Sequence, residues 1–307
     1  MNEMHSGAQY AGWPRLGVLV SHLRLEEKLI LQAARAKGYD VTPLFDRSLV
    51  IDLSARTAEA AGIHVDVVLD RGVVHSRAEY TLNAFERWGI PTVNPPKATS
   101  LCDDKALCTL AIEEAGLLTP RTLLAFSVDA AIEACETVGY PAVLKPITGS
   151  WGRLLAKVNG PDQARVILEQ KEQLGSFHHQ IFYVQEFIEK PGRDIRVYVI
   201  GDRAIASSYR SSEHWITNSA RGAVSTSCPI TPEIEEIALK AKDAVGAMLA
   251  GIDLMETDDG YSVIEVNTGA EFKGLMGTTD IDIAAEIIDE VVRVASRART
   301  NGVAQAV

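Results

Sequence analysis

Residues 251–274 read GIDLMETDDGYSVIEVNTGAEFKG, and this stretch decides the fold of the chain. Residues 252–256 and 261–266 are rich in apolar and β-branched side chains and predict two short strands. The Asp-Asp-Gly sequence at 258–260 is typical of a tight turn, so the two strands are expected to pair as a hairpin. In such a hairpin, successive side chains point to opposite faces.

Three oxygen donors are expected on one face of this hairpin. Glu265 and Asn267 lie two residues apart, so both point to the same side of an extended strand. Asp253 can reach that side from the partner strand. Two carboxylates and an amide on a stiff support suit a Mg²⁺ ion that also contacts substrate phosphates. The spacing alone leaves a second interpretation open, in which Asp253 and Glu265 are solvated charges at strand ends.

Length and charge limit the possible functions. The chain has 307 residues and 47% hydrophobic content, enough for a sizeable core and for two or three domains. Its net charge is -11 and its pI is about 5.2. This acidity argues against a broad surface for binding DNA or RNA, so an anionic partner requires a local basic patch.

The four cysteines show neither a zinc-binding nor a disulfide pattern. They include no CxxC pair and no matched histidine spacing, so reduced thiols in a cytoplasmic protein are expected. No apolar run approaches the roughly 20 residues that span a bilayer. Residues 1–14 lack the apolar core of a signal peptide and are expected to be a disordered leader. The cysteines are Cys102, Cys108, Cys135 and Cys228.

The amino-terminal part of the chain alternates strands with helices. This order predicts an α/β architecture with a parallel sheet covered by helices. No GxGxxG follows the first strand and no GxxxxGK[ST] occurs, so both familiar phosphate loops are missing. The expected strands are 15–20, 40–44, 65–69 and 91–94, and the expected helices are 24–37 and 76–88.

The double proline Pro95-Pro96 is expected to mark a domain boundary. Ser100, with Asp103 three residues later, forms a capping pattern for the next helix. This helix is expected to continue to Glu114, with Lys105 in its first turns.

A glycine-rich loop lies between two strands expected within residues 140–158. Such a loop can fold over a triphosphate, because glycines let backbone N–H groups approach the phosphates closely. Lys145 on the preceding strand can neutralise phosphate charge. An alternative stays open, in which Lys145 ends an edge strand in water and Gly149 and Gly152 merely turn a hairpin.

Residues 185–188 can form an apolar slot with a peptide edge, which is what an adenine ring needs. Asp194 is placed to accept a hydrogen bond from a ribose hydroxyl. The other expected elements are a helix at 128–138, a strand at 181–188, a hairpin at 195–209, a polar loop at 214–222, and helices at 232–250 and 281–298.

Eight features occur in an order that resembles the ATP-grasp superfamily, specifically its RimK-type carboxylate–amine ligases. They are Lys105, AVLKP, GSWGRL, VQEFI, RDIRVYVIGD, NSARG, GIDLM and VIEVN. GSWGRLLA, HWITNSARG and EVNTGAEFKG resemble the LysX-type branch of that family. The resemblance covers residues 15–298 and implies an ATP-grasp fold with an amino-terminal Rossmann-like, pre-ATP-grasp domain. The implied parts are that domain at 15–98, a central subdomain with a lid at 99–187, and a carboxy-terminal subdomain with a magnesium site at 188–307.

The resemblance also implies a role for each matching residue. Lys105 and Lys145 would hold the phosphates of ATP, and Asp194 its ribose. The lid would consist of Gly149, Ser150, Trp151 and Gly152, and the adenine hinge of Gln185, Glu186 and Ile188. The Mg²⁺ ligands would be Asp253, Glu265 and Asn267. The transferring phosphoryl group would be stabilised by Arg196, Asn218 and Arg221.

The segment after Asn267 departs from one part of the family. It reads Thr-Gly-Ala-Glu-Phe-Lys, whereas the ribosomal-protein ligases have a Ser-Pro-Gly type of sequence there. The resemblance implies an amide-forming ligase that joins the carboxyl-terminal glutamate of a small acidic carrier protein to the α-amino group of α-aminoadipate, in lysine biosynthesis. The alternatives are glutamate transfer to a carrier or ribosomal protein tail, a small-molecule ligase, a kinase, and a non-catalytic nucleotide sensor.

Four residues are candidates for binding the carboxylates of an acidic amino acid, although a solvated or salt-bridged role is equally open for each. Neither nucleic acid nor a membrane is expected as a partner. The oligomeric state stays open, with a dimer or a tetramer as candidates. The four residues are Arg71, Ser76, Arg77 and Lys273.

Overall fold

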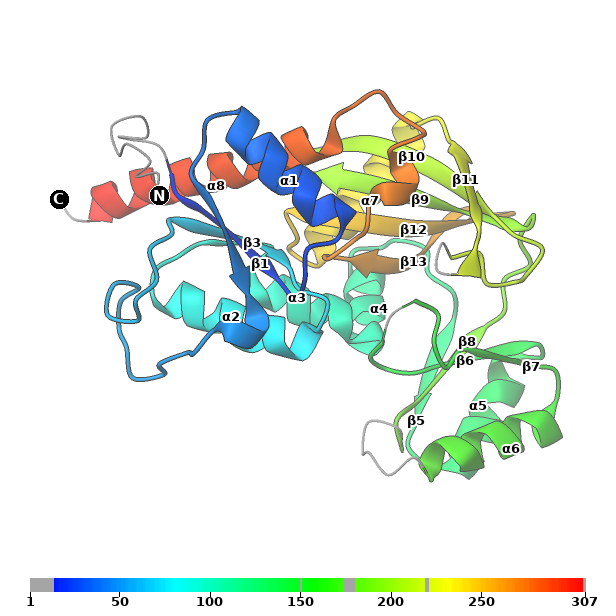
Figure 1. Ribbon diagram of the computed structural model, residues 1–307. Helices are drawn as coiled ribbons and strands as arrows, with labels where there is room; N and C mark the ends of the chain where they lie inside the picture. Colours follow the sequence, from blue (N-terminus) through cyan, green and yellow to red (C-terminus); the bar gives the residue numbers. More distant parts are fainter. Residues whose placement is uncertain (1–13, 150, 174–179, 219–220, 306–307) are drawn as a thin grey trace.

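The computed structural model describes residues 14–149, 151–173, 180–218 and 221–305. Its strands form three sheets (Figure 1). The expected leader lies outside the described residues except for Pro14, which is buried. Ser150 of the expected lid also lies outside them. Within the described part of the chain, no helix combines the length and hydropathy needed to cross a membrane.

The first sheet is parallel, with strand order β2-β1-β3-β4, as the alternating pattern predicted. Both of its faces are buried. Val18 joins the core beneath α1, whereas its neighbour Leu19 joins the core beneath α2. The elements are β1 (Leu16–Val20), α1 (Leu25–Ala36), β2 (Val41–Phe45), η1 (Asp46–Ser48), β3 (Val67–Arg71), α2 (His75–Arg87) and β4 (Thr92–Val93).

The helix expected from Ser100 to Glu114 is two helices, α3 (Pro96–Asp103) and α4 (Lys105–Glu114). Pro96 begins α3, because a proline fits the first turn of a helix, where no partner for its missing N–H is needed. Asp104 is extended and caps α4 by accepting hydrogen bonds from two backbone N–H groups. The expected Ser100 cap is therefore wrong, and Ser100 donates to Glu79 from within α3.

The second sheet is antiparallel, with order β5-β8-β6-β7, and α5 and α6 cover it in a separate lobe (Figure 1). Ser127 caps α5 and Gly139 ends it, as predicted. The sequence interpretation missed β5 and α6. The elements are β5 (Thr122–Ala125), α5 (Val128–Val138), β6 (Ala142–Lys145), β7 (Ala156–Val158), α6 (Pro161–Glu172) and β8 (Phe182–Glu186).

The third sheet is antiparallel, with order β11-β10-β9-β12-β13. The central hairpin is confirmed, with longer strands than expected. The helix expected to reach residue 250 ends at Ala244, because Gly246 takes a positive φ of 70° and the chain then enters β12. The elements are β9 (Arg193–Ile200), β10 (Arg203–Ser211), β11 (Val224–Ser227), α7 (Pro232–Ala244), β12 (Leu249–Thr257), β13 (Gly260–Asn267), η4 (Lys273–Leu275) and α8 (Ile283–Gln305).

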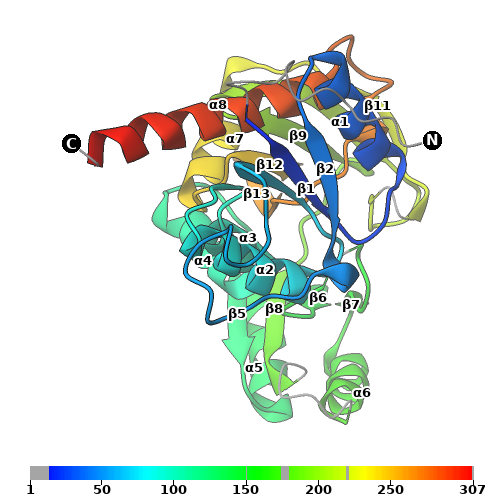
Figure 2. The same cartoon turned by 60° about the vertical axis from the view of Figure 1, so that its left-hand side comes forward.

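The first and third sheets share one hydrophobic core. Helix α8 runs beside α1 and contacts β3 and β9 (Figures 1 and 2). Tyr198 and Leu249 of the third sheet belong to the same cluster as Val18 and Leu69 of the first. All four cysteines lie in the described residues and are free and buried, as expected for reduced thiols.

Candidate active site

Asp253 is the centre of a row of charged side chains across the third sheet. It pairs in register with Glu265 on β13 and with Arg196 on β9. Residues directly opposite each other on antiparallel strands point to the same face. The hairpin therefore brings Asp253 and Glu265 together on one face, as the spacing predicted.

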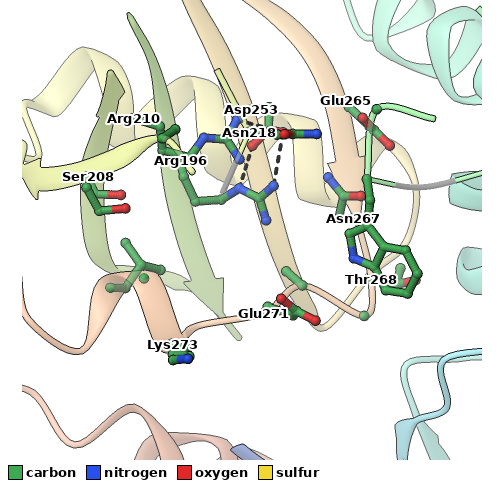
Figure 3. A pocket seen from close by; sticks show the side chains of 18 of the residues that line it. Arg196, Ser208, Arg210, Asn218, Asp253, Glu265, Asn267, Thr268, Glu271 and Lys273 are labelled. Carbon is green, nitrogen blue, oxygen red and sulfur yellow. Dashed lines mark hydrogen bonds and ion pairs between the residues drawn. The ribbon is translucent and has the colours of Figure 1, made fainter. Parts of the chain in front are cut away.

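Two arginines hold the Asp253 carboxylate (Figure 3). Arg196 Nε donates to Asp253 Oδ1 at 2.5 Å and its Nη2 to Oδ2 at 3.0 Å. Arg210 Nη2 lies 3.0 Å from the same Oδ2. Burial works to raise the pKa of Asp253, but the two guanidinium groups outweigh it and hold that pKa below its usual range. Arg210, which the sequence interpretation missed, is thus a central member of the site.

Asp194 belongs to a buried network rather than to open solvent. Its Oδ1 accepts from Arg210 Nε at 2.6 Å, its Oδ2 accepts from Thr217, and Lys190 Nζ lies 3.7 Å away. Asp194 lines a cavity between the second and third sheets. Both of its oxygens already accept hydrogen bonds from the protein, and its contact with a ribose stays a prediction.

The cavity between the second and third sheets has a volume of about 120 Å³, and Lys105, Lys145 and Lys190 lie in its wall. Lys145 is 8% exposed, and its burial lowers its pKa to about 8, with Lys105 adding a smaller repulsion and Glu265 opposing. Lys105 Nζ donates to the carbonyl oxygen of Gly149 at 2.6 Å, which ties α4 to the glycine-rich loop.

The expected hinge also lines this cavity. Gln185 is buried and donates from Nε2 to Thr122 Oγ1 at 2.9 Å and to the Tyr183 hydroxyl at 3.0 Å. Glu186 Oε1 accepts from the backbone N–H of Arg121 at 2.7 Å. Both side chains are thus engaged by the second sheet, which leaves the backbone edge and Ile188 to face a ligand.

Two aromatic side chains complete the slot: Phe187, which lies within the predicted 185–188 segment but was given no separate role, and Trp215, which the sequence interpretation missed. Phe187 and Trp215 both line the cavity, with ring centroids 6.1 Å apart in an edge-to-face arrangement. Lys157 Nζ lies 4.1 Å from the centroid of Phe187. For Phe187 the available signal was its place within residues 185–188, the expected adenine slot.

The glycine-rich loop contacts the far wall of the cavity. A β-carbon at Gly152, whose φ is 65°, would lie 2.6 Å from Nδ2 of Asn218. Glycine at 152 therefore permits the loop to approach Asn218. Trp151 is 39% exposed and stacks with Arg153, whose Cζ lies 4.7 Å from the ring centroid. The loop thus places a large ring at the cavity mouth.

The donor set at the hairpin fits a hard cation. No group of three or more His, Cys, Asp or Glu side chains that could hold a metal occurs among the described residues. Mg²⁺, however, is commonly bound through one or two carboxylates together with substrate phosphates. Glu265 and Asn267 both line the larger cavity described below, so a carboxylate and an amide oxygen are available to such an ion. The buried Nδ2 of Asn267 has no hydrogen-bond partner among the described residues and can donate to an oxygen of a bound phosphate. A cation here would have to share Asp253 with the two arginines.

A second, larger cavity of about 510 Å³ opens between the first and third sheets. Lys273 and Glu271 line it (Figure 3). Arg24 and His75 line it as well. Of these four residues, the sequence interpretation had singled out only Lys273. The two cavities meet at a common wall. The residues that line both are Trp151, Gly152, Arg210, Asn218, Asp253 and Glu265.

Three of the four expected carboxylate binders do not line either cavity. Arg71 is 4% exposed and is bound by Glu26, Glu27 and the carbonyl of Ala270, which is the salt-bridged role that the sequence left open for it.

Arg77 pairs with Asp46, and Ser76 lies at the start of α2 outside both linings. Arg221 also lies outside both linings, although its backbone N–H donates to Asn218 Oδ1 at 3.1 Å.

Comparisons with known proteins agree with this fold. Residues 102–291 match the RimK-like ATP-grasp domain and residues 16–101 the LysX preATP-grasp domain. Alpha-aminoadipate–LysW ligase LysX of Sulfurisphaera tokodaii is 35% identical over 278 residues, covering 90% of this chain and 97% of that protein. Glutamate–LysW ligase ArgX of Sulfolobus acidocaldarius is 33% identical over 282 residues, covering 90% and 98%.

Solved structures show the same fold. A RimK domain ATP-grasp protein from Sphaerobacter thermophilus has a TM-score of 0.76 and 26% identity, covering 90% of this chain and 99% of its own. The ATP-grasp ligase PsnB, solved with a minimal precursor, Mg and ADP, has a TM-score of 0.70 and 21% identity, covering 92% and 98%. The chain therefore belongs to the RimK-like ATP-grasp family and is an ATP-dependent ligase that joins a carboxylate to an amine.

Proposed function

We propose that this ligase joins the carboxyl-terminal glutamate of a small acidic carrier protein to the α-amino group of α-aminoadipate, as a cytoplasmic step of lysine biosynthesis. The observation that supports it is the wall shared by the two cavities. Asp253, Glu265, Arg210 and Asn218 face both the slot suited to a nucleotide and the larger cavity suited to the other substrates.

The shared wall suits a reaction through an acyl phosphate. A carboxylate is a poor electrophile, because its oxygen is a poor leaving group. Bound ATP with Mg²⁺ would supply the phosphoryl group that activates it. Transfer of a phosphoryl group depends on positioning and on charge neutralisation rather than on covalent chemistry by the protein. Arg210 lines both cavities, Arg196 lines the larger one and Lys145 lines the smaller one, so cationic groups surround the wall where the transfer would occur.

Each group of residues has a distinct task in this proposal. Lys105 and Lys145 bind the phosphates, and Glu265 with Asn267 and Asp253 hold Mg²⁺. Arg196 and Arg210 orient the carboxylate and stabilise charge as the phosphoryl group moves. The loop with Trp151 closes the mouth of the slot and excludes water, which would otherwise hydrolyse the acyl phosphate.

The choice of substrates rests on the relatives. The relative that is 35% identical is named for α-aminoadipate and LysW, and the relative that is 33% identical for glutamate and LysW. Glutamate as the amine is therefore the second candidate. The two amino acids differ by one methylene, which a pocket discriminates by only about 1–3 kcal/mol.

The experiment measures ADP release with the carrier protein plus α-aminoadipate, the carrier plus glutamate, and free glutamate plus α-aminoadipate. We expect the first mixture to be fastest and the carrier to gain the mass of α-aminoadipate minus water. If α-aminoadipate gives equal rates of ADP release with the carrier protein and with free glutamate, the enzyme would be a small-molecule ligase. ADP release that yields a phosphorylated product and no amide would indicate a kinase. If adding the amine causes no release of ADP, the protein would be a nucleotide sensor.

A further inference from the structure

Residues 268–273 form the floor of the larger cavity. The segment follows β13 directly, and Thr268, Gly269, Ala270, Glu271 and Lys273 all line this cavity. None of them lines the smaller cavity assigned to the nucleotide. Because the segment runs from the end of β13 to the first residue of η4 and belongs to no strand, its backbone needs other groups to fix it.

The first of these groups is Asn94, which follows β4 and is 2% exposed. Its Nδ2 donates to the carbonyl of Thr268 at 3.0 Å and to that of Leu249 at 2.8 Å. Its Oδ1 accepts from the backbone N–H groups of Met248 and Leu249 at 2.7 and 2.8 Å. One amide thus ties the start of the segment to the start of β12.

The other end of the segment is held by a buried ion pair. Glu26 in the first turn of α1 accepts at Oε1 from the backbone N–H groups of Phe272 and Lys273, at 2.9 and 2.7 Å. Its Oε2 accepts from Arg71 Nη2 at 2.6 Å, and Arg71 Nη1 donates to the carbonyl of Ala270 at 2.9 Å. Glu26 and Arg71 are each 4% exposed.

We propose that Asn94, Arg71 and Glu26 are positioning residues, which set the shape of the amine-binding cavity through the backbone of residues 268–273. The inference deepens the proposed function, because it assigns that cavity to the amine. All three act on main-chain groups of the segment, so the side chain of Lys273 stays available to the substrate, while Glu271 pairs with Arg24 at 2.6 Å. Buried polar groups with complete hydrogen bonding specify one arrangement, since any other leaves a buried group unpaired.

The test compares three variants on one helix. Glu26→Ala removes both acceptors, whereas Glu26→Gln keeps an oxygen that can accept from the two N–H groups but removes the charge. Ile30→Val removes one buried methylene from the same helix and touches no polar group of the segment. Hydrogen exchange of the Phe272 and Lys273 amides is measured without substrates, together with KM for the amine and KM for ATP.

We expect Glu26→Ala to speed exchange of these two amides about tenfold and to raise KM for the amine about tenfold, as loss of a charged acceptor allows. KM for ATP should change less than about twofold, because the segment does not line the nucleotide slot. Glu26→Gln should also speed exchange of the two amides and raise KM for the amine, but by a smaller factor. If Glu26→Ala does not fold, the result with Glu26→Gln tests the positioning role.

Exchange that is no faster than in Ile30→Val, or a parallel rise in both KM values, would overturn the positioning role. The two proposals can fail separately. If the wild-type enzyme ligates no acidic amino acid, the proposed function is wrong, and the exchange of Phe272 and Lys273 still tests the positioning role.

Discussion

Gly251 lies so close beneath Ala270 that a β-carbon at position 251 would stand 2.5 Å from the β-carbon of Ala270. The same added carbon would lie 2.7 Å from Nη1 of Arg196. Strand β12 can therefore pass under the cavity floor and beside Arg196 only if residue 251 has no side chain. This glycine precedes Asp253 by two residues, so it faces the same side of the sheet.

Gly251→Ala should displace either Ala270 or Arg196 and so disturb the Arg196–Asp253 pair. We expect a loss of stability of about 1–3 kcal/mol, as is usual for overpacking, and a fall in turnover of at least about tenfold. ADP release and thermal unfolding measure the two effects. Gly277→Ala is the control, because a β-carbon there meets nothing within 4 Å. Wild-type turnover in Gly251→Ala would contradict the close packing described above.

Glu265→Gln should remove most turnover and leave the fold intact, because it deletes a charge at the cation site and keeps the shape. We expect a decrease of about a hundredfold or more in amide formation at saturating ATP and Mg²⁺. Asp258→Asn, an exposed carboxylate in the turn of the same hairpin, is the matched control. Unchanged amide formation in Glu265→Gln would rule out this residue as a metal ligand.

The pH dependence of ATP use should follow Lys145. Its pKa of about 8 lies below the value of 10.5 for a free lysine, so the folded enzyme loses this proton first as pH rises. We expect kcat/KM for ATP to fall above pH 8, where the neutral amine no longer attracts phosphate. Over the same interval, between about pH 8 and 10.5, the contribution of Lys145 to the free energy of unfolding should increase.

Lys145→Arg supplies the control for this profile. Arginine stays protonated throughout the range, so the variant should lose the bend near pH 8 even if its activity is lower. A bend that persists unchanged in Lys145→Arg would assign it to another group.

Trp151 should report closure of the glycine-rich loop. Its ring is 39% exposed at the cavity mouth, so its fluorescence should change when ATP and Mg²⁺ bind. Trp215 lines the same slot and is a second source of signal. We would therefore compare wild type with Trp151→Phe and with Trp215→Phe on adding nucleotide. A response that is identical in wild type and Trp151→Phe would count against a mobile loop.

Use of the acidic carrier should depend on salt. The enzyme has a net charge of -11, so productive docking requires a local cation such as Lys273 at the cavity wall. Raising salt from 0.1 M to 1 M shortens the Debye length from about 10 Å to about 3 Å, so KM for the carrier should rise. Lys273→Glu should raise that KM more than KM for ATP. Salt-independent use of the carrier would contradict this electrostatic docking.

Local patterns in the sequence predicted most of the fold. The hairpin that carries Asp253 and Glu265 was recognisable from its period of two and its Asp-Asp-Gly turn, both of which act over a few residues. The short edge strand β11 was missed because it is mostly exposed and polar, so it shows no apolar alternation. Gly246 was the overlooked stop that shortened α7.

The site was harder to predict where partners come from distant parts of the chain. The sequence left a substrate-binding and a salt-bridged role equally open for Arg71, and only the fold shows that Glu26 and Glu27 pair with it. Arg210 was missed because its role comes from ion pairs with Asp194 and Asp253, which are 16 and 43 residues away in sequence. Tertiary pairing of this kind leaves no periodic signal along the chain.

The shared core of the first and third sheets has a consequence for protein engineering. The match to the preATP-grasp domain ends at residue 101 and the match to the RimK-like ATP-grasp domain begins at residue 102. Residue 101 would therefore be the obvious junction for a chimera of two relatives. Yet α8 belongs spatially to the first sheet, where Lys37 pairs with Asp289 at 2.7 Å. A recombinant that takes its first 101 residues from a relative therefore needs a matching α8, and the two ends of the chain form one exchangeable unit.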